Sequence, residues 1–288
     1  GNSTHEITLS STTPNKTIYT TNAALPTVSI VKVSSLTNEI ISGAVVDILQ
    51  DDKVVWDDMV LTDEMVFTLE PGEYSAVEVK APAGYVLDST PVNFTVVDDA
   101  TVENKVVLKN DPVIVEINKF GEDENGTFDY NDKKYSFLPD CEFVMTNKAD
   151  STISYTWTTG DSTQEFIAVP VGEYEIKEVK TPELYQGISE PISFTVEETN
   201  KVNFCNIYND IKVFSVVIDK VNPQGKYIFT DFELLKGSAV VDTFNAGSYR
   251  IDLQPGEYTI KELAAPKGYA KAPAFTFTID TNGVITEN

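Results

Sequence analysis

The chain has 288 residues, 45 of them acidic and 21 basic, and its formal net charge is -24. This charge disfavours a nucleic acid or an anionic membrane as a partner. The sequence has no apolar run of 18 residues and no signal-peptide pattern, which predicts a mature or trimmed extracellular segment without membrane insertion. Valine, threonine and aromatic residues are prominent, and proline and glycine interrupt short apolar runs, which favours an all-β fold.

Residues 1–27 are rich in serine, threonine and asparagine and predict a linker, or a strand left from a preceding element. Three repeats follow, at residues 28–111, 112–211 and 212–288. Each has about seven short strands separated by turn signals, which is typical of a β-sandwich of immunoglobulin or transthyretin topology. The periodicity of the strands does not distinguish between these two topologies. The sequence therefore predicts three tandem immunoglobulin/transthyretin-like β-sandwich domains in an elongated array.

The opening strand of each repeat places a lysine on its apolar face. Lys32 alternates with Val28 and Ile30, and Lys119 and Lys220 occupy the same position in the other repeats. Side chains in a strand alternate faces with a period of two, so these lysines are expected to point into the core. Desolvation there favours the neutral amine, which is a nucleophile.

In the second repeat a long acidic loop is expected at residues 121–139. Calcium would suit its oxygen atoms, but the spacing is not that of an EF-hand, and a solvated loop is the alternative. We expect no metal and no cofactor. The polar side chains concerned are Glu122, Asp123, Glu124, Asp129, Asn131 and Asp132.

The two cysteines, Cys141 and Cys205, both lie in the second repeat. Cys141 alternates with Phe143 and Cys205 with Ile207, so both are expected to face the core. They could form a disulfide in an extracellular protein, or they could be two buried thiols. Parity gives the direction of each side chain but not the distance that a disulfide requires.

Each repeat then contains one recurring phrase, with a glutamate four residues after its tyrosine. The phrases are LEPGEYSAVEVKAPAGY from Leu69, VPVGEYEIKEVKTPELY from Val169 and LQPGEYTIKELAAPKGY from Leu253. Glu78, Glu178 and Glu262 share a strand face with the tyrosines, and that face is expected to be buried. A carboxylate is costly in a core unless it is paired or protonated.

The closing strands supply an asparagine at the corresponding place. Asn110 alternates with Leu108, Asn209 with Ile207, and Asn288 is the candidate in the third repeat. Another asparagine of that repeat, Asn282, lies in the turn sequence DTNG and is less suited to face a core. Each repeat thus offers a lysine, a glutamate and an asparagine to one core.

These three residue types could form an amide bond between the lysine and asparagine side chains. The glutamate would polarise the asparagine carbonyl and relay a proton to the departing ammonia, and fixed positions in a dry core would supply the rate. The alternative is an ordinary buried ion pair, or a lysine that extends its ammonium to solvent. Recurrence of the same three residue types in three repeats favours the bond.

The phrases resemble the E-box of collagen-adhesin B-type (Cna-B or SpaA-like) domains, which occur in pilins and adhesins of Gram-positive bacteria. The resemblance covers all but the first 27 residues. The second phrase departs from the pattern YxLxETxAPxGY, with Thr181 in place of the alanine and Leu184 in place of the glycine. The first and third phrases match it at Tyr74, Glu78, Ala81, Pro82, Gly84 and Tyr85 and at Tyr258, Glu262, Ala265, Pro266, Gly268 and Tyr269.

The resemblance implies one intramolecular isopeptide bond in each domain, between the first-strand lysine and the last-strand asparagine, with the core glutamate as catalyst. The implied sets are Lys32 with Asn110 and Glu78, Lys119 with Asn209 and Glu178, and Lys220 with Asn288 and Glu262.

The resemblance also implies the stalk or shaft of a pilin or adhesin at the bacterial cell surface, anchored to the cell wall or built into a pilus. Its partners would be other subunits, or a host extracellular protein or glycan. An alternative is a host-ligand-binding adhesin module with the second-domain loop as its site. We expect no turnover enzyme, because the bond consumes the chain's own side chains and the only histidine, His5, lies outside the repeats.

Overall fold

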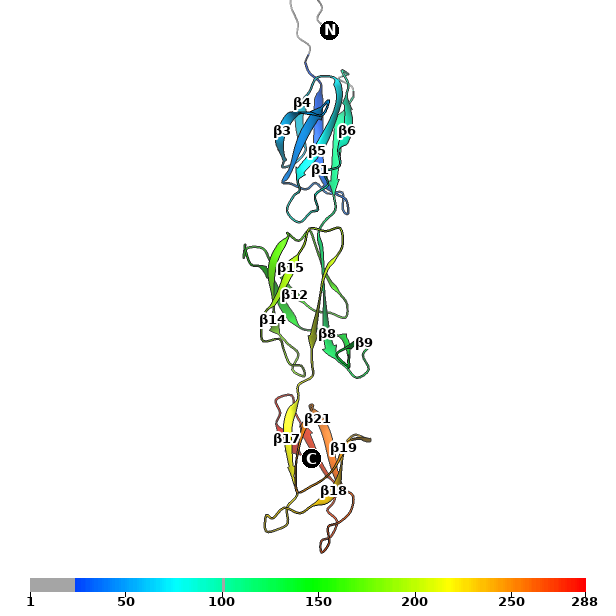
Figure 1. Ribbon diagram of the computed structural model, residues 1–288, viewed down its shortest axis with the longest axis vertical. Helices are drawn as coiled ribbons and strands as arrows, with labels where there is room; N and C mark the ends of the chain where they lie inside the picture. The colour runs from blue at the N-terminus through cyan, green and yellow to red at the C-terminus, as the bar shows by residue number, and fades with distance from the viewer. Residues whose placement is uncertain (1–23, 100–101) are drawn as a thin grey trace, which may run out of the picture. The chain divides into compact units, whose positions relative to one another are not determined.

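The computed structural model describes residues 24–99 and 102–288 (Figure 1). These residues form strands β1 to β23 and contain no helix, so the all-β prediction is confirmed. The described part therefore contains no helix long and apolar enough to cross a membrane. Residues 1–23, most of the predicted N-terminal linker, lie outside the described residues.

Contacts divide the chain into two compact units. The first ends at Asp111, and the second comprises Ala83–Val86 and Pro112–Asn288. The first unit holds the first repeat with one hydrophobic core, and the second unit holds the second and third repeats with a core in each.

Two sheets form the first repeat, and their apolar faces share one core that includes Ile30, Ile48 and Tyr74. One sheet has the order β4-β1-β7, namely β4 (Met65–Thr68), β1 (Thr27–Ser34) and β7 (Asn104–Asn110). The other has the order β3-β2-β5-β6, namely β3 (Lys53–Leu61), β2 (Ala44–Gln50), β5 (Gly72–Lys80) and β6 (Val92–Val96).

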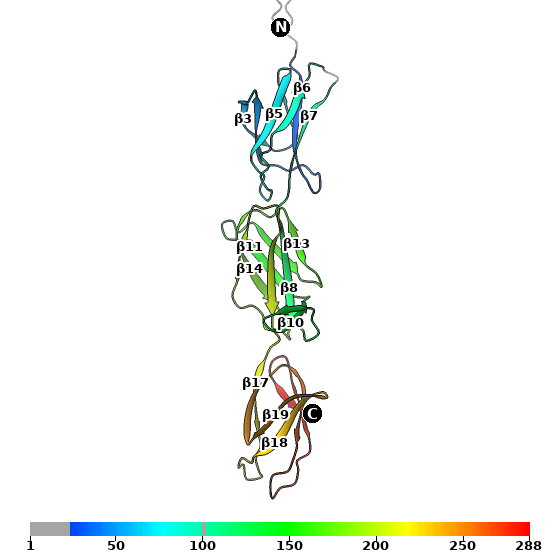
Figure 2. The ribbon, with the colours of Figure 1, turned by 45° about the vertical axis from the view of Figure 1, so that its right-hand side comes forward.

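The second repeat is likewise built from two sheets (Figure 2). Its core includes Ile117, Phe143 and Tyr174. One sheet has the order β13 (Gln164–Ile167), β8 (Ile114–Glu122), β10 (Lys133–Phe137) and β9 (Phe128–Tyr130). The last strand of the repeat, β16 (Asn203–Asn209), also pairs with β8. The other sheet has the order β12 (Ser154–Thr158), β11 (Glu142–Asn147), β14 (Gly172–Lys180) and β15 (Ile192–Val196).

The third repeat has a smaller first sheet and a core that includes Val216, Leu234 and Phe277. The first sheet consists of β17 (Phe214–Asp219) and β20 (Ser248–Leu253). The second has the order β19 (Ala239–Ala246), β18 (Thr230–Lys236), β21 (Gly256–Glu262), β22 (Phe275–Ile279) and β23 (Ile285–Glu287).

The first and last strands of the first two repeats run side by side in parallel. Lys32 on β1 lies opposite Leu108 on β7, and Lys119 on β8 lies opposite Ile207 on β16. Buried and exposed residues alternate along β7, so the asparagine that ends this strand faces the core. The same pairing brings Asn209 to the core of the second repeat, where it is 1% exposed.

The third repeat departs from this arrangement. Its last strand β23 pairs antiparallel with β22, because a turn at Asp280 and Gly283 returns the chain directly onto β22. Asn288 is consequently exposed. This corrects the expectation that Asn288 faces the core, which assumed that the last strand would pair with the first.

Residues 121–139, expected to be an acidic loop, largely form strands. β8 continues to Glu122, and β9 and β10 form a hairpin that adds to β8. Asn131 and Asp132 at its tip have φ angles of 49° and 60°, as a two-residue hairpin turn of type I′ requires. The alternating sequences around this Asn-Asp pair were the signal that the loop expectation overlooked.

Candidate functional site

The glutamate of each recurring phrase is buried among apolar strands. Glu78 on β5 lies opposite Val46 on β2, and the other two glutamates lie opposite phenylalanines on β11 and β18. The side chains of all three are only 1% exposed. We call Glu78, Glu178 and Glu262 the core glutamates.

In the first repeat, the lysine, the glutamate and the asparagine meet. The Nζ atom of Lys32 lies 3.1 Å from Oε1 of Glu78, and Nδ2 of Asn110 donates a hydrogen bond of 2.9 Å to the same oxygen. Lys32 Nζ also donates to the carbonyl of Lys109 at 3.3 Å. The carboxylate therefore holds the amine and the amide side by side in the core.

The second repeat brings the same three residue types together. Nδ2 of Asn209 donates to both carboxylate oxygens of Glu178, at 2.8 and 3.1 Å. Lys119 Nζ lies 3.8 Å from Oε1 of Glu178 and has no hydrogen-bond partner. This amine is buried beside the carboxylate that holds the asparagine amide.

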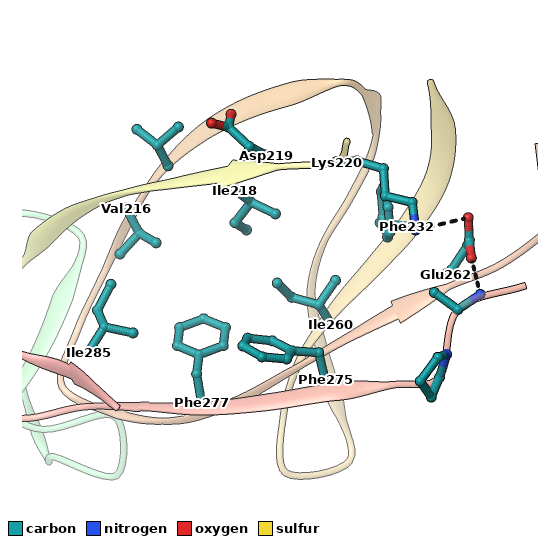
Figure 3. Close-up of a pocket in the computed structure, with 13 residues that line it drawn as sticks. Val216, Ile218, Asp219, Lys220, Phe232, Ile260, Glu262, Phe275, Phe277 and Ile285 are labelled. Atoms are coloured by element: carbon teal, nitrogen blue, oxygen red, sulfur yellow. Dashed lines mark hydrogen bonds and ion pairs between the residues drawn. The ribbon is translucent and has the colours of Figure 1, made fainter. Parts of the chain in front are cut away.

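In the third repeat only the lysine and the glutamate meet. Lys220 Nζ lies 3.7 Å from Oε1 of Glu262 (Figure 3). Nδ2 of Asn288 instead donates to Glu257 on β21 at 3.0 Å and to Thr278 on β22 at 2.8 Å, and both hydrogen bonds are exposed. The structure therefore assembles two of the three predicted sets and leaves Asn288 outside the third.

Each core glutamate also accepts a hydrogen bond from a backbone amide that was not predicted from the sequence. Oε2 accepts a hydrogen bond from the amide ten residues further along the chain, contributed by Asp88, Ile188 or Ala272. The distances are 3.1, 2.8 and 2.6 Å. The spacing of ten residues between the glutamate and the donor is the same in all three repeats. It could not predict the donor from the sequence, because the conformation of the loop between them was not known.

The altered turn of the second phrase does not disturb this contact. Gly84 and Gly268 have φ angles of 83° and 90°, which favour glycine, whereas Leu184 is not among the residues with positive φ. The loop of the second phrase thus has a different backbone conformation, in which Leu184 does not need the positive φ angle that the two glycines adopt. Ile188 still donates to Glu178.

Burial is the main cause of the electrostatic shifts at these sites. Desolvation lowers the pKa of Lys32, and it lowers that of Lys119 to about 8 against the opposing attraction of Glu178. The ring of Phe143 lies 5.8 Å from Lys119 Nζ and forms part of the apolar wall. At pH 7 about a tenth of Lys119 is therefore a neutral amine, far more than for a lysine with the ordinary pKa of 10.5.

The cysteines of the second repeat are both free thiols. Cys141 directly precedes β11 and Cys205 lies on β16, so they belong to opposite sheets. Facing the same core does not bring them within bonding distance, which corrects the possible disulfide. Burial raises the pKa of Cys141 to about 11, so it stays protonated and unreactive.

Two acidic side chains of residues 121–139 are paired with lysines. Glu122 lies 3.0 Å from Lys133, and Asp129 lies 3.2 Å from Lys134. Within residues 24–99 and 102–288, the one group of three carboxylates close enough to share a metal ion lies in the first repeat and is largely exposed. It consists of Asp47, Asp57 and Asp58.

The comparison with protein families identifies the repeats. The family model of the SpaA prealbumin-like fold domain matches residues 26–112, 127–210 and 215–288. The chain belongs to this family. We number its SpaA domains first, second and third in chain order. The lysine, the core glutamate and the asparagine meet in the first and second SpaA domains, whereas Asn288 of the third SpaA domain lies outside its site.

The chain also resembles solved structures. The chain is similar to the Bacillus anthracis TIE protein, with 23% identity and a TM-score of 0.56 over 89% of this chain and 48% of that one. It thus spans about half the length of the TIE protein. BcpA, the major pilin subunit of Bacillus cereus, is 17% identical, with a TM-score of 0.45 over 91% of both chains. A streptococcal ancillary pilin is 16% identical, with a TM-score of 0.39 over 88% and 95%. No curated protein matches the chain.

Proposed function

We propose that this chain is a load-bearing stalk segment of a Gram-positive surface protein, in which the first and second SpaA domains cross-link themselves. The observation that carries the proposal is the meeting of Lys32, Glu78 and Asn110 in a dry core, repeated with Lys119, Glu178 and Asn209. Membership of the SpaA family supports a place in a pilin or an adhesin. The partners would then be other subunits of the same surface structure.

The reaction joins two side chains and expels ammonia. The lone pair of Lys32 Nζ attacks Cγ of Asn110, the bond from Cγ to Nδ2 breaks, and the new amide keeps the carbonyl oxygen. Glu78 takes a proton from the attacking nitrogen and passes it to the leaving nitrogen, which departs as ammonia. The carboxyl is regenerated, but the lysine and the asparagine are consumed, so each domain reacts once.

Position and a dry environment are what the fold contributes to this reaction. The core glutamate holds the amide within 2.9 Å and the amine within 3.1 Å of one oxygen in the first SpaA domain. Neighbours fixed in this way react as though at very high concentration. No external enzyme and no cofactor are needed.

The bond would fasten the first strand of a domain to its last strand. In the chain-entropy treatment used for disulfides, closing a loop of this length stabilises the folded state by about 4 to 5 kcal/mol. The bond would also change how the domain resists a pulling force. A pulling force that enters at β1 and leaves at β7 passes through covalent bonds, and the strands between them are not loaded.

Stretching single chains tests this role. Asn110 lies 78 positions after Lys32, so these residues would add about 250 Å of length if the first domain could be extended. We expect no such step in the wild-type chain and its appearance in Lys32→Ala. The third SpaA domain, which has no bond in the proposal, should extend in both chains and is the internal control. A step of about 250 Å from the first domain of the wild-type chain would refute the proposal.

A further inference from the structure

Two tyrosines stack on the surface of the second SpaA domain, where the β9–β10 hairpin meets β16. The rings of Tyr130 on β9 and Tyr208 on β16 have centroids 4.1 Å apart and planes 9° from parallel. Tyr208 also stacks on Phe120, which is buried. Tyr130 is 45% exposed. Because the ring of Tyr208 covers one face of Tyr130, the exposed part of Tyr130 is its other face and its edges.

A pocket of about 460 Å³ lies against these rings. Its volume is within the range of small-molecule sites, which combine aromatic walls with a few polar groups. Asn209 also borders the pocket, but it is 1% exposed and offers a ligand almost no polar surface. The lining residues that present an aromatic ring or an accessible polar group are Tyr130, Tyr135, Tyr208, Asn131, Gln186 and Asp210.

The carboxylate of Asp210 is fixed at the wall of this pocket. Its Oδ1 accepts a hydrogen bond of 2.6 Å from the hydroxyl of Tyr135, and its Oδ2 lies 3.1 Å from Lys133 Nζ. The side chain of Asp210 is nevertheless 52% exposed. A carboxylate can accept about four hydrogen bonds, so Asp210 retains acceptor capacity for a ligand. An acceptor that is already held in place costs little entropy to use.

We propose that this pocket binds a neutral saccharide. One face of a pyranose ring stacks on Tyr130, and its hydroxyls form hydrogen bonds with Asp210, Asn131 and Gln186. The inference goes beyond the proposed function and does not depend on the cross-links. It gives the hairpin of the second domain a ligand of definite chemical class.

The pocket matches the two kinds of surface that a sugar presents. The C–H groups on a pyranose face carry partial positive charge and are attracted to the negative face of an aromatic ring. Each hydroxyl at the rim of the sugar both donates and accepts hydrogen bonds. Asp210 can accept, and the amides of Asn131 and Gln186, which are exposed, can do both. A wholly apolar ligand would make no use of these groups.

The charges at the pocket favour a neutral sugar over an acidic one. Lys133 lies 3.0 Å from Glu122 and 3.1 Å from Asp210, so its ammonium is already paired with two carboxylates. These three groups together carry a net negative charge, and the whole chain has a formal charge of -24. A uronic or sialic acid would bring a further negative charge to this surface.

Saturation-transfer NMR on the full chain tests the inference with lactose, cellobiose and mannobiose, which are neutral and present galactose, glucose and mannose. We expect at least one of them to bind with a Kd in the millimolar range. Magnetisation should reach mainly the C–H hydrogens on one face of a ring. Tyr130→Ala should weaken this binding about tenfold, because the stacked ring is lost. Tyr130→Phe keeps the aromatic face and should bind within about twofold of the wild-type chain.

Two further variants separate loss of the ligand contact from a change in the hairpin. Gln186→Ala lies outside the hairpin and should weaken binding by about threefold or more, the effect of one lost hydrogen bond. Tyr269→Ala is the matched control, because Tyr269 is 43% exposed and does not line the pocket. It should leave the Kd unchanged. Calorimetry of each variant checks that the second domain remains folded.

The inference is wrong if none of the three disaccharides receives magnetisation, or if Tyr130→Ala binds as the wild-type chain does. Equal weakening by Tyr269→Ala would show that the contact lies elsewhere and would also overturn it. Methyl glucoside and methyl glucuronide share one ring and differ by a carboxylate. Tighter binding of the glucuronide would refute the assignment to a neutral sugar.

Discussion

The Glu78→Ala variant is expected to leave Lys32 and Asn110 unjoined and to lower the free energy of unfolding of the first domain by about 7 to 10 kcal/mol. About 3 to 5 kcal/mol of this loss comes from leaving Lys32 buried without its counter-charge. The bond that no longer forms accounts for about 4 to 5 kcal/mol. Calorimetry of the full chain should show one unfolding transition moved to lower temperature and the others unchanged.

Two further variants divide this effect into its parts. Asn110→Ala keeps the contact between Lys32 and Glu78 but removes the electrophile, so it should lose only the contribution of the bond. Glu73→Ala removes an outward-facing glutamate from the same strand and should change stability by less than about 0.5 kcal/mol. If Asn110→Ala melts at the wild-type temperature, the bond contributes nothing and the account of the first domain is wrong.

The stability of an unbonded second domain is expected to rise with pH. In an Asn209→Ala variant Lys119 stays an amine, and burial lowers its pKa from 10.5 to about 8. Below pH 8 the lysine is charged in both the folded and the unfolded state, and the folded state bears the cost of desolvation. Between pH 8 and 10.5 the folded state releases the proton while the unfolded state keeps it, so stability increases with pH. The increase should approach about 3 kcal/mol across this window.

Denaturant unfolding of Asn209→Ala at several pH values measures this slope. The matched control adds Lys119→Met, which replaces the amine with an apolar side chain of similar length and should remove the rise. Stability that falls between pH 8 and 10.5 in Asn209→Ala alone would show that the buried lysine is stabilised as a cation, and the nucleophile assigned here would not be available.

Side-chain parity predicted those parts of the sites that depend on one strand alone. Lys32 and Glu78 alternate with apolar neighbours, and the structure buries both. The recurrence of the phrase in three repeats extended the inference to Lys119, Glu178 and Glu262. A period of two is a property of the strand backbone, so it holds whichever strand lies alongside.

Features that depend on the choice of neighbouring strand were not predictable in this way. Asn288 directly follows the last strand of its domain, yet that strand pairs with β22 instead of the opening strand. The two cysteines both face a core but lie in opposite sheets. Parity specifies a face, whereas pairing and distance depend on contacts between residues far apart in the sequence.

The acidic segment of the second domain illustrates a different limit. Its composition suggested a solvated loop, but Asn131 and Asp132 adopt the positive φ angles of a tight hairpin turn, and the flanking residues pair. The ability of these two residues to form a tight turn determined the structure of the segment more than the charge of the surrounding residues did. Asp129 on the hairpin remains exposed and pairs with Lys134, whereas Glu122 at the end of β8 is largely buried and pairs with Lys133.

The intact mass of the denatured chain tests the central claim most directly. Each cross-link expels one ammonia, so we expect a mass two ammonias below the sequence mass. In Asn110→Ala or Asn209→Ala the deficit should be one ammonia, after allowing for the substitution. A deficit of three would mean that Asn288 reaches Lys220 after all. A chain with its full sequence mass would contradict the account.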